Sequence, residues 1–128
     1  TQSLDYHIIG FHGAKGAWGD RVMDQIAPQG DEIVLAKTSS SVFISTNIDY
    51  VLRNLGVKQL VISGVITDQC VESAIRDACD LGYLVTQVSD ACLTYSAQRH
   101  AQSLRTIQGY CRQVTTQQLV AEIANIRS

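Results

Sequence analysis

The segment of residues 60–71 constrains the fold of this chain most, because it joins an apolar run to a helical pattern through a tight turn. The β-branched run at residues 60–62 is typical of a buried parallel strand. From Val71 onward, apolar residues recur every three or four positions, which predicts a helix. Thr67 and Asp68 are good N-cap residues for its start. A strand, a turn and a helix in this order are the building block of an α/β fold.

The rest of the chain alternates between the same two patterns. Strands are predicted at residues 32–36, 59–65, 83–89 and 110–114, and helices at 46–55, 67–81, 96–108 and 116–126, with a short helical stretch near 20–26. Strands that alternate with helices predict parallel βαβ units in a three-layer α/β sandwich. A chain of 128 residues suits a single domain.

Cys70 lies on the first turn of the predicted helix, where backbone N–H groups have no partner inside the helix. These groups and the helix dipole favour the thiolate, which is the nucleophilic form of cysteine. The same N–H groups can receive an oxyanion. The alternative is that Cys70 is a small buried apolar residue, which is common for cysteine.

Lys37 directly follows the strand predicted at residues 32–36. Parallel sheets bind their ligands at the carboxyl ends of the strands, so this lysine is a candidate site residue. The alternative is a solvated surface lysine. Trp18 and Phe43 are candidates for an apolar wall against a small planar substrate, and Thr67 and Gln69 are candidates to line the turn beside the thiol.

Charge and composition exclude several classes of function. The net charge is −2 and the lysines and arginines are scattered, so no basic stripe exists to bind nucleic acid or a membrane surface. The four cysteines and three histidines show no spacing typical of a metal site, and no secretory segment is visible. We therefore expect reduced thiols, a cytoplasmic location, and neither a metal nor an organic cofactor.

Four ordered motifs resemble those of one family. The segment GVITDQCVESAIRDACDLGY at residues 64–83 closely resembles the signature of the isochorismatase-like cysteine hydrolases, a superfamily that includes amidohydrolases of small amides and ureides. Residues 37–43 resemble its K-x-x-x-S-x-F element, and residues 16–28 its G-x-W-G…P element. Residues 89–104 resemble its D-A…S-x-x-x-H-x-x-x-L run, so the resemblance covers nearly the whole chain.

The resemblance implies a mechanism and its residues. The family works through a Cys–Asp–Lys triad and a thioester, which makes Cys70 the nucleophile and Lys37 the triad lysine. It implies an oxyanion hole made of the backbone N–H groups of Ile66 and Cys70, with a cis peptide between Val65 and Ile66. The expected reaction is cleavage of a C–N bond in a small amide or ureide.

The chain departs from the family at its N-terminal side. The family's aspartate ends an apolar first strand, and no such run precedes Lys37; Asp5 stands in a different context. The resemblance thus implies that residues 1–128 form a single, N-terminally incomplete domain whose first two strands lie outside the sequence. The start at Thr1 rather than Met fits a processed or truncated product.

An incomplete sheet would expose unpaired strand edges, which are prone to associate with other strands. We therefore expect a complementing N-terminal segment or a homo-oligomer. Two other functions remain open at this point. One is hydrolysis of a vinyl ether, which isochorismatase itself performs without a cysteine nucleophile, and the other is a catalytically incomplete fragment that serves as an assembly subunit.

Overall fold

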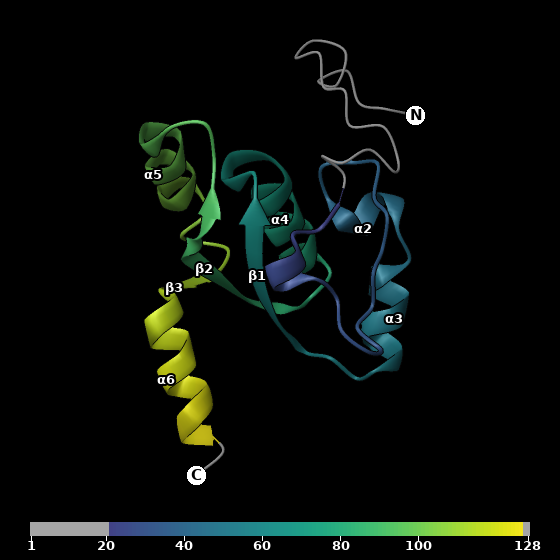
Figure 1. Ribbon diagram of the computed structural model, residues 1–128. Coiled ribbons are helices and arrows are strands. Elements are labelled where there is room, and N and C mark those ends of the chain that lie inside the picture. Colours follow the sequence, from purple (N-terminus) through teal and green to yellow (C-terminus); the bar gives the residue numbers. More distant parts are fainter. Residues whose placement is uncertain (1–20, 127–128) are drawn as a thin grey trace.

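The computed structural model describes residues 21–126. In chain order, its elements are the 3-10 turn η2 (Asp24–Ile26), α2 (Val42–Ser45), α3 (Ile48–Asn54), β1 (Gln59–Val65), the π-helical turn η3 (Thr67–Val71), α4 (Glu72–Asp80), β2 (Leu84–Leu93), α5 (Ala97–Thr106), β3 (Arg112–Val114) and α6 (Thr116–Ile126) (Figure 1). No helix among these residues combines the length and apolarity needed to cross a bilayer.

One sheet organises the described residues. Its strands run in the order β1-β2-β3, and both neighbouring pairs are parallel. Successive strand residues point to opposite faces, and Gln87 and Val88 of β2 are both buried. The middle strand is therefore covered on both faces, and α4 and α6 both contact it. The predicted α/β class with a parallel sheet is confirmed.

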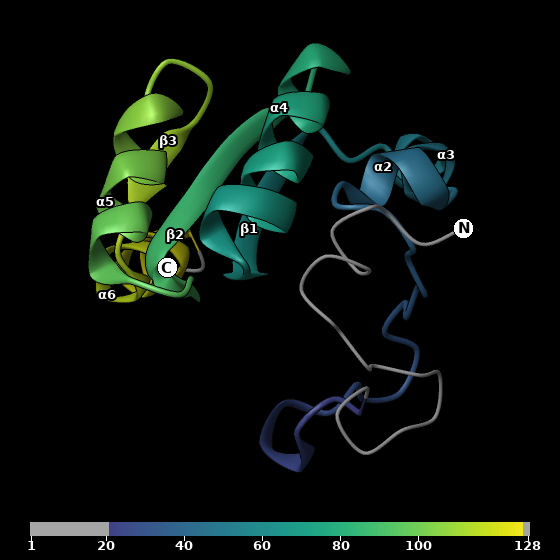
Figure 2. The same ribbon diagram turned by 90° about the horizontal axis from the view of Figure 1, so that it is seen from above.

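The core lies between α4 and the sheet. Ile75 and Ala78 on one face of α4 have no exposed surface, and they pack with Val85 of β2 and Ile107, which follows α5. This is the apolar stripe that the spacing predicted for the helix after the turn. Seen from above, α4 lies beside β1, with α2 and α3 on its other side (Figure 2). The core thus fixes the position of the turn at the start of α4.

The strand predicted at residues 32–36 does not form. These residues have no regular secondary structure, and Ile33 and Val34 are exposed by 57% and 65%. A strand is stable only when it pairs with a neighbour, and in the described part of the chain β1 pairs with β2 alone. The prediction of a strand at residues 32–36 is therefore wrong for residues 21–126, where this apolar run pairs with no strand.

Several other boundaries differ from the predictions. The helix predicted from residue 46 begins at Ile48, because Thr46 Oγ1 accepts a hydrogen bond from the Ile48 amide and donates one to Val42 O. Strand β2 extends to Leu93, beyond residue 89, and β3 starts at Arg112, so Cys111 precedes the strand. The predicted bounds of β1 and α6 agree with the structure.

The C-terminal part of β1 carries an irregularity next to the turn. The pairing register between β1 and β2 shifts between Ile62 and Gly64, as in a β-bulge. Gly64 has φ = 129°, a conformation that residues with a side chain rarely adopt. Two steps along β1, from Ile62 to Gly64, face five steps along β2, from Gln87 to Cys92. The additional residues therefore lie in β2, opposite the end of β1 that leads to the Cys70 turn.

Candidate functional site

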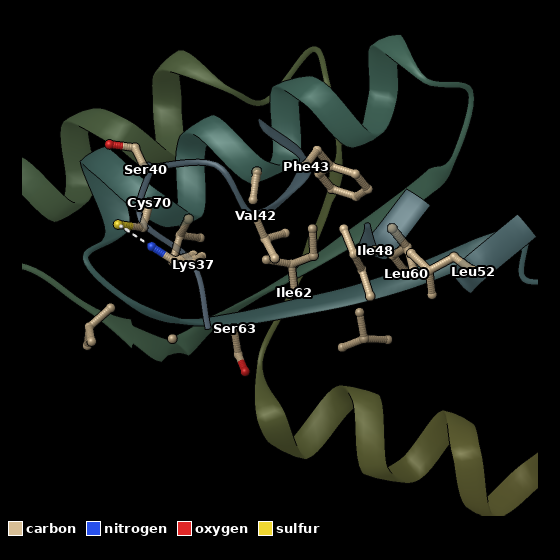
Figure 3. Close-up of a pocket in the computed structure, with 15 residues that line it drawn as sticks. Lys37, Ser40, Val42, Phe43, Ile48, Leu52, Leu60, Ile62, Ser63 and Cys70 are labelled. Carbon is tan, nitrogen blue, oxygen red and sulfur yellow. Dashed lines mark hydrogen bonds between the residues drawn. The ribbon is translucent and has the colours of Figure 1, made fainter. Parts of the chain in front are cut away.

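Lys37 and Cys70 lie side by side although 33 positions separate them in the sequence. The Lys37 Nζ atom lies 3.4 Å from the Cys70 Sγ atom (Figure 3). Lys37 belongs to the irregular segment before α2, and Cys70 belongs to η3, where it is half-buried. The structure therefore brings together the two side chains for which sequence patterns predicted a shared site, even though the strand expected before Lys37 is absent.

A serine-rich loop holds Lys37. Its Nζ atom also donates to Ser39 O at 2.9 Å, so the ammonium bridges its own loop and the sulfur. The amides of Thr38 and Ser39 both donate to Ser45 Oγ, at 3.0 and 3.3 Å. The buried Ser41 caps α2 by accepting from the Phe43 amide. Sequence reasoning identified the lysine but missed the roles of Ser39 and Ser45, for which the only signal was the run of serines.

An apolar groove of about 320 Å³ leads along β1 to these two residues. Its walls come from β1, α2, α3 and α4, and Phe43 lies on one side while Cys70 and Lys37 lie at one end (Figure 3). The other side chains that line it are mostly aliphatic: Val42, Ile48, Leu52, Leu60, Val61, Ile62, Val65, Val71 and Ala74, with Ser40 and Ser63. Phe43 therefore lies where the sequence predicted an apolar wall.

The turn before Cys70 is compact. The Val65–Ile66 peptide bond is cis. Ile66 O accepts hydrogen bonds from the amides of Gln69 at 3.1 Å and Val71 at 3.2 Å, the second of which is the i to i−5 bond of a π-helical turn. The Ile66 and Cys70 amides, predicted to form an oxyanion hole, thus belong to the same short turn as the sulfur. Their role in binding an oxyanion stays a prediction.

The other predicted substrate contacts fall in different places. Thr67 has no exposed surface and does not line the groove, because its hydroxyl lies 3.0 Å from His100 Nδ1. Gln69 is half-buried and is also not among the residues that line the groove. Trp18 lies outside the described residues. Of the four candidates, Phe43 alone is placed in the groove by the structure of residues 21–126.

Thr67 and Asp68 do not cap the helix, which corrects the expectation from their residue types. No side chain caps η3 or α4, and the two residues instead reach toward α5 and the loop before it. Asp68 accepts from Thr94 Oγ1 at 2.5 Å and from Arg99 Nε at 2.6 Å. Burial by itself raises the pKa of Asp68, but the hydrogen bonds from Thr94 and Arg99 outweigh it and hold the pKa below its ordinary value.

Charges near the pair of Lys37 and Cys70 are few. Among residues 21–126, no carboxylate forms an ion pair with Lys37. Asp90 does not serve here, since it accepts from the amide and hydroxyl of Thr116 at the start of α6. The described residues also hold no cluster of three His, Cys, Asp or Glu side chains that would suit a metal. The site as described offers a thiol, an ammonium and an apolar groove.

Comparison with known sequences gives a consistent result along the chain. A sequence model of the isochorismatase domain matches residues 3–118. The ureidoacrylate amidohydrolase RutB of Agrobacterium fabrum is 44% identical over 78 residues, which cover 61% of this chain and 34% of that protein. RutB of Rhizobium rhizogenes is also 44% identical, over 32% of its length. The match spans about a third of the length of these curated relatives.

Solved structures share the fold. An isochorismatase-like hydrolase from Alkaliphilus metalliredigens superposes with a TM-score of 0.87 at 28% identity, covering 94% of this chain and 66% of that one. The N-carbamoylsarcosine amidase of Thermoplasma acidophilum superposes with a TM-score of 0.77 at 29% identity, covering 88% of this chain and 64% of that one. In each of these two solved structures, the part of the chain outside the match has no counterpart in residues 1–128.

Proposed function

The chain belongs to the isochorismatase family, and from that premise we propose that it carries the nucleophile of a hydrolase that cleaves a C–N bond in a small amide or ureide. The relatives named for amide hydrolysis, a ureidoacrylate amidohydrolase and an N-carbamoylsarcosine amidase, support the choice of reaction. Cys70 is the nucleophile and Lys37 the cationic partner in this proposal.

The observation that carries the proposal is the 3.4 Å contact between Lys37 Nζ and Cys70 Sγ at the end of the apolar groove. An ammonium next to sulfur stabilises negative charge on it, and the thiolate is the form that attacks a carbonyl. Lys37 is exposed and Cys70 is half-buried, so solvent partly screens this contact and its effect is modest.

The reaction proceeds in two halves. A general base takes the thiol proton, and the Cys70 sulfur forms a bond to the substrate carbonyl carbon. The resulting oxyanion is held by the Ile66 and Cys70 amides and by the Lys37 ammonium. The C–N bond then breaks, the nitrogen leaves with a proton as ammonia or an amine, and a thioester remains. Water adds to the thioester, releases the carboxylic acid and restores the thiol.

The general base is proposed to be a carboxylate outside residues 21–126, the aspartate of the family's triad. The described residues place no carboxylate in an ion pair with Lys37, so in this proposal the base comes from outside them. We propose that it arrives on a strand that pairs with the edge of β1 left open among residues 21–126 and brings the carboxylate next to Lys37. The other arrangement is a homo-oligomer, in which a second copy of this protein covers the edge of β1.

The test is release of ammonia or amine from a panel that contains a ureidoacrylate, an N-carbamoyl amino acid and simple primary amides. We expect Cys70→Ala to abolish turnover and Cys79→Ala to retain it, since Cys79 contacts Tyr110 O and not the groove. Mass spectrometry of the protein quenched during turnover should show an acyl adduct on Cys70. Full activity of Cys70→Ala would exclude the proposed nucleophile.

Two alternatives give different results in the same experiment. Vinyl ether hydrolysis predicts turnover of isochorismate that survives Cys70→Ala. A catalytically incomplete assembly subunit predicts no turnover of any substrate by the wild-type chain, and the absence of a carboxylate partner for Lys37 in the described residues favours this second alternative. A cytoplasmic location is proposed with the enzyme, because the four cysteines are unpaired thiols, as a reducing compartment requires.

A further inference from the structure

The turn that carries Cys70 is held from its far side by α5. We propose that Arg99, His100 and Ser103 are positioning residues, which keep the Cys70 sulfur against Lys37 by fixing Thr67 and Asp68, the first two residues of η3. This inference rests on the proposed function for its catalytic meaning. The structural part of the inference, that the contact between Lys37 and Cys70 depends on α5, does not require a substrate.

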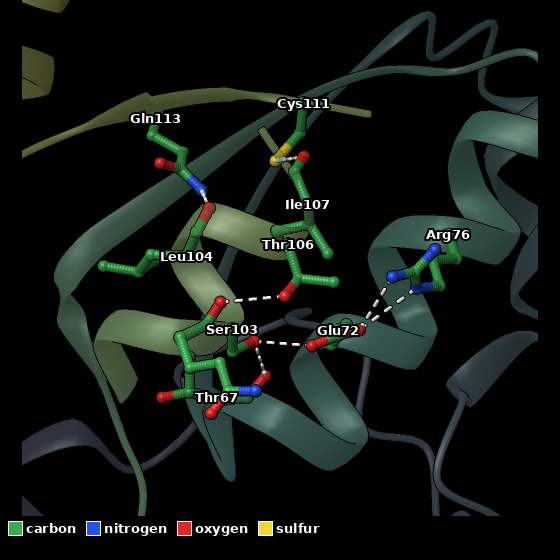
Figure 4. Close-up of polar contacts among 10 residues, drawn as sticks. Thr67, Glu72, Arg76, Ser103, Leu104, Thr106, Ile107, Cys111 and Gln113 are labelled. Carbon is green, nitrogen blue, oxygen red and sulfur yellow. Dashed lines mark hydrogen bonds and ion pairs between the residues drawn. The ribbon is translucent and has the colours of Figure 1, made fainter. Parts of the chain in front are cut away.

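The first contact fixes Thr67, the first residue of η3. Thr67 Oγ1 lies 3.0 Å from His100 Nδ1, and the Thr67 side chain is completely buried. Ser103, one turn further along α5, is also buried and lies 3.5 Å from Thr67 O. Its hydroxyl donates to Glu72 Oε2 at 2.6 Å, so α5 also contacts the first residue of α4 (Figure 4).

The second contact fixes Asp68. Its carboxylate receives Arg99 Nε at 2.6 Å and Nη2 at 2.5 Å, and Thr94 Oγ1 binds its other oxygen at 2.5 Å. The guanidinium of Arg99 also lies over the ring of Tyr95, 5.2 Å from its centroid. Both arginine nitrogens contact Oδ2, while Thr94 donates to Oδ1, so each carboxylate oxygen has its own donor. Asp68 is therefore held in one orientation from two sides.

These contacts matter because of where they act. η3 has only five residues; Thr67 and Asp68 point to α5, while Cys70 lines the groove. A π-helical turn is rare, occurs mostly as a single turn, and is frequent at functional sites. Loss of the hold on Thr67 and Asp68 would thus move the sulfur relative to Lys37, which sits on a different segment.

The alternative is that α5 contributes only to folding. It predicts that variants of α5 lower the stability of the chain but leave the contact between Lys37 and Cys70 unchanged in every folded molecule. The two explanations differ in coupling, which a double-mutant cycle measures. Each variant is measured under conditions in which its own urea unfolding curve shows it to be fully folded. Differences in stability then do not contribute to the measured coupling.

The experiment measures the rate of Cys70 alkylation by iodoacetamide at a fixed neutral pH, with peptide mapping to assign the site. In the wild-type chain, Lys37→Met is expected to slow the rate roughly fivefold, as for a partly exposed charge contact. In the Arg99→Gln background the same change should have less than about a twofold effect, because the sulfur no longer faces the ammonium. Arg99→Lys keeps the positive charge but not the two guanidinium N–H contacts. In that background, the effect of Lys37→Met on the alkylation rate should be intermediate.

Arg112→Gln is the matched control, because Arg112 of β3 forms an exposed ion pair with Glu122 of α6 and contacts neither Thr67 nor Asp68 through a hydrogen bond or ion pair among the described residues. In that background, Lys37→Met should retain its full effect. An equally large Lys37→Met effect in the Arg99→Gln and Arg112→Gln backgrounds would overturn the proposal. The alkylation readout needs no substrate, so this failure is distinct from failure of the proposed function, which appears as absent turnover by the wild-type chain.

With an active protein, a second readout applies to the same variants. Positioning predicts that Arg99→Gln and His100→Ala lower kcat while KM changes less than about twofold, because the groove that binds substrate is intact. A change in stability alone would leave kcat per folded molecule at the wild-type value.

Discussion

The reactivity of a thiol depends on its surroundings, and the four cysteines of this chain lie in different ones. Burial raises the pKa of Cys79 and of Cys92, and it raises the pKa of Cys111 to about 11. Cys70 is half-buried like Cys79 and Cys111, but it lies at the end of a groove with an ammonium beside its sulfur. At the scale of single residues, the structure thus separates one thiol from the other three.

The first prediction is that iodoacetamide modifies Cys70 before the other three cysteines. At pH 8 only about one Cys111 thiol in a thousand is ionised, given a pKa of about 11. Peptide mapping after short exposure checks the order, with urea-unfolded protein as the reference in which all four react alike. Equal rates at Cys70 and Cys111 in the folded chain would contradict it.

The second prediction concerns Asp68, whose pKa in the folded chain lies below its ordinary value. A lowered pKa means that the folded state favours the carboxylate, so this stabilisation is complete above the unfolded pKa, about 3.9. It is lost as pH falls through the folded pKa. Asp68→Asn should therefore lower the free energy of unfolding by roughly 1.5–3 kcal/mol near neutral pH, as expected for hydrogen bonds to a charged group.

The measurement is urea unfolding of wild type and Asp68→Asn at neutral pH and at a lower pH, below the unfolded value of about 3.9, where the stabilisation by the carboxylate is being lost. The difference between the two proteins should narrow strongly at the lower pH. A difference that stays constant would mean that the charge of Asp68 contributes nothing to stability. Asp24, which is largely exposed, supplies the control in Asp24→Asn.

Sequence patterns identified Cys70 and Lys37 but not the contacts of Thr67 and Asp68. The first two lie in motifs whose residue types fit one chemistry. For the other two, local preference predicted helix caps, whereas their partners are residues of α5 and the loop before it, about 30 positions away. Local sequence does not determine whether such a side chain bonds to the nearby backbone or to a distant residue, so these contacts are seen only in the structure.

Among the elements, α4 joins the candidate site to the core. Ile75 has no exposed surface and lies in the central cluster with Val85 and Ile107. We predict that Ile75→Ala lowers the free energy of unfolding by about 2–5 kcal/mol, because it removes buried apolar contacts and leaves a cavity. The shift of the urea midpoint, followed by circular dichroism, measures this loss.

The control for this change is Val120→Ala on α6, where the valine is 59% exposed. A substitution on such a surface should change stability by less than about 0.5 kcal/mol. Equal losses for the two variants would mean that the contact between α4 and the sheet does not dominate the core.

Elements were predictable where their partners lie nearby in the chain. The bounds of β1 and α6 follow from their sequence patterns because β1 pairs with β2, one βα unit later, and α6 has a clear helical period. The strand predicted at residues 32–36 had an equally apolar pattern, yet it lacks a neighbour among residues 21–126. The spacing of apolar residues indicates which face of a strand would be buried. Whether the strand forms also depends on a neighbouring strand or helix that packs against that face.

At the scale of the whole molecule, the sheet is unequally covered. The middle strand is buried on both faces, whereas β1 at the edge exposes Val61 by 56% and Val65 by 66%. Leu84 and Leu93 of β2, each 67% exposed, pair in register next to the ends of β1. Within residues 21–126 this strand edge is unpaired, and an unpaired edge beside exposed apolar side chains is a surface on which other chains assemble.

The last prediction is that the chain associates through this surface, in a concentration-dependent manner, when no complementing strand is present. Val61→Lys combined with Val65→Lys should weaken association roughly tenfold or more, because two copies would bring like charges together. Both side chains are exposed, so the monomer fold tolerates the change. Light scattering coupled to size-exclusion chromatography over a dilution series measures the mass of the species present.

Ile44→Lys is the matched control, since Ile44 is 72% exposed on α2 and does not line the groove. It should leave association unchanged, which distinguishes the surface on β1 from a general effect of added charge. A wild-type chain that stays monomeric at every concentration, or equal weakening by all lysine variants, would show that β1 is not the surface of assembly. A peptide strand that restores the monomer in the wild type would identify the same edge as the place where a complementing segment binds.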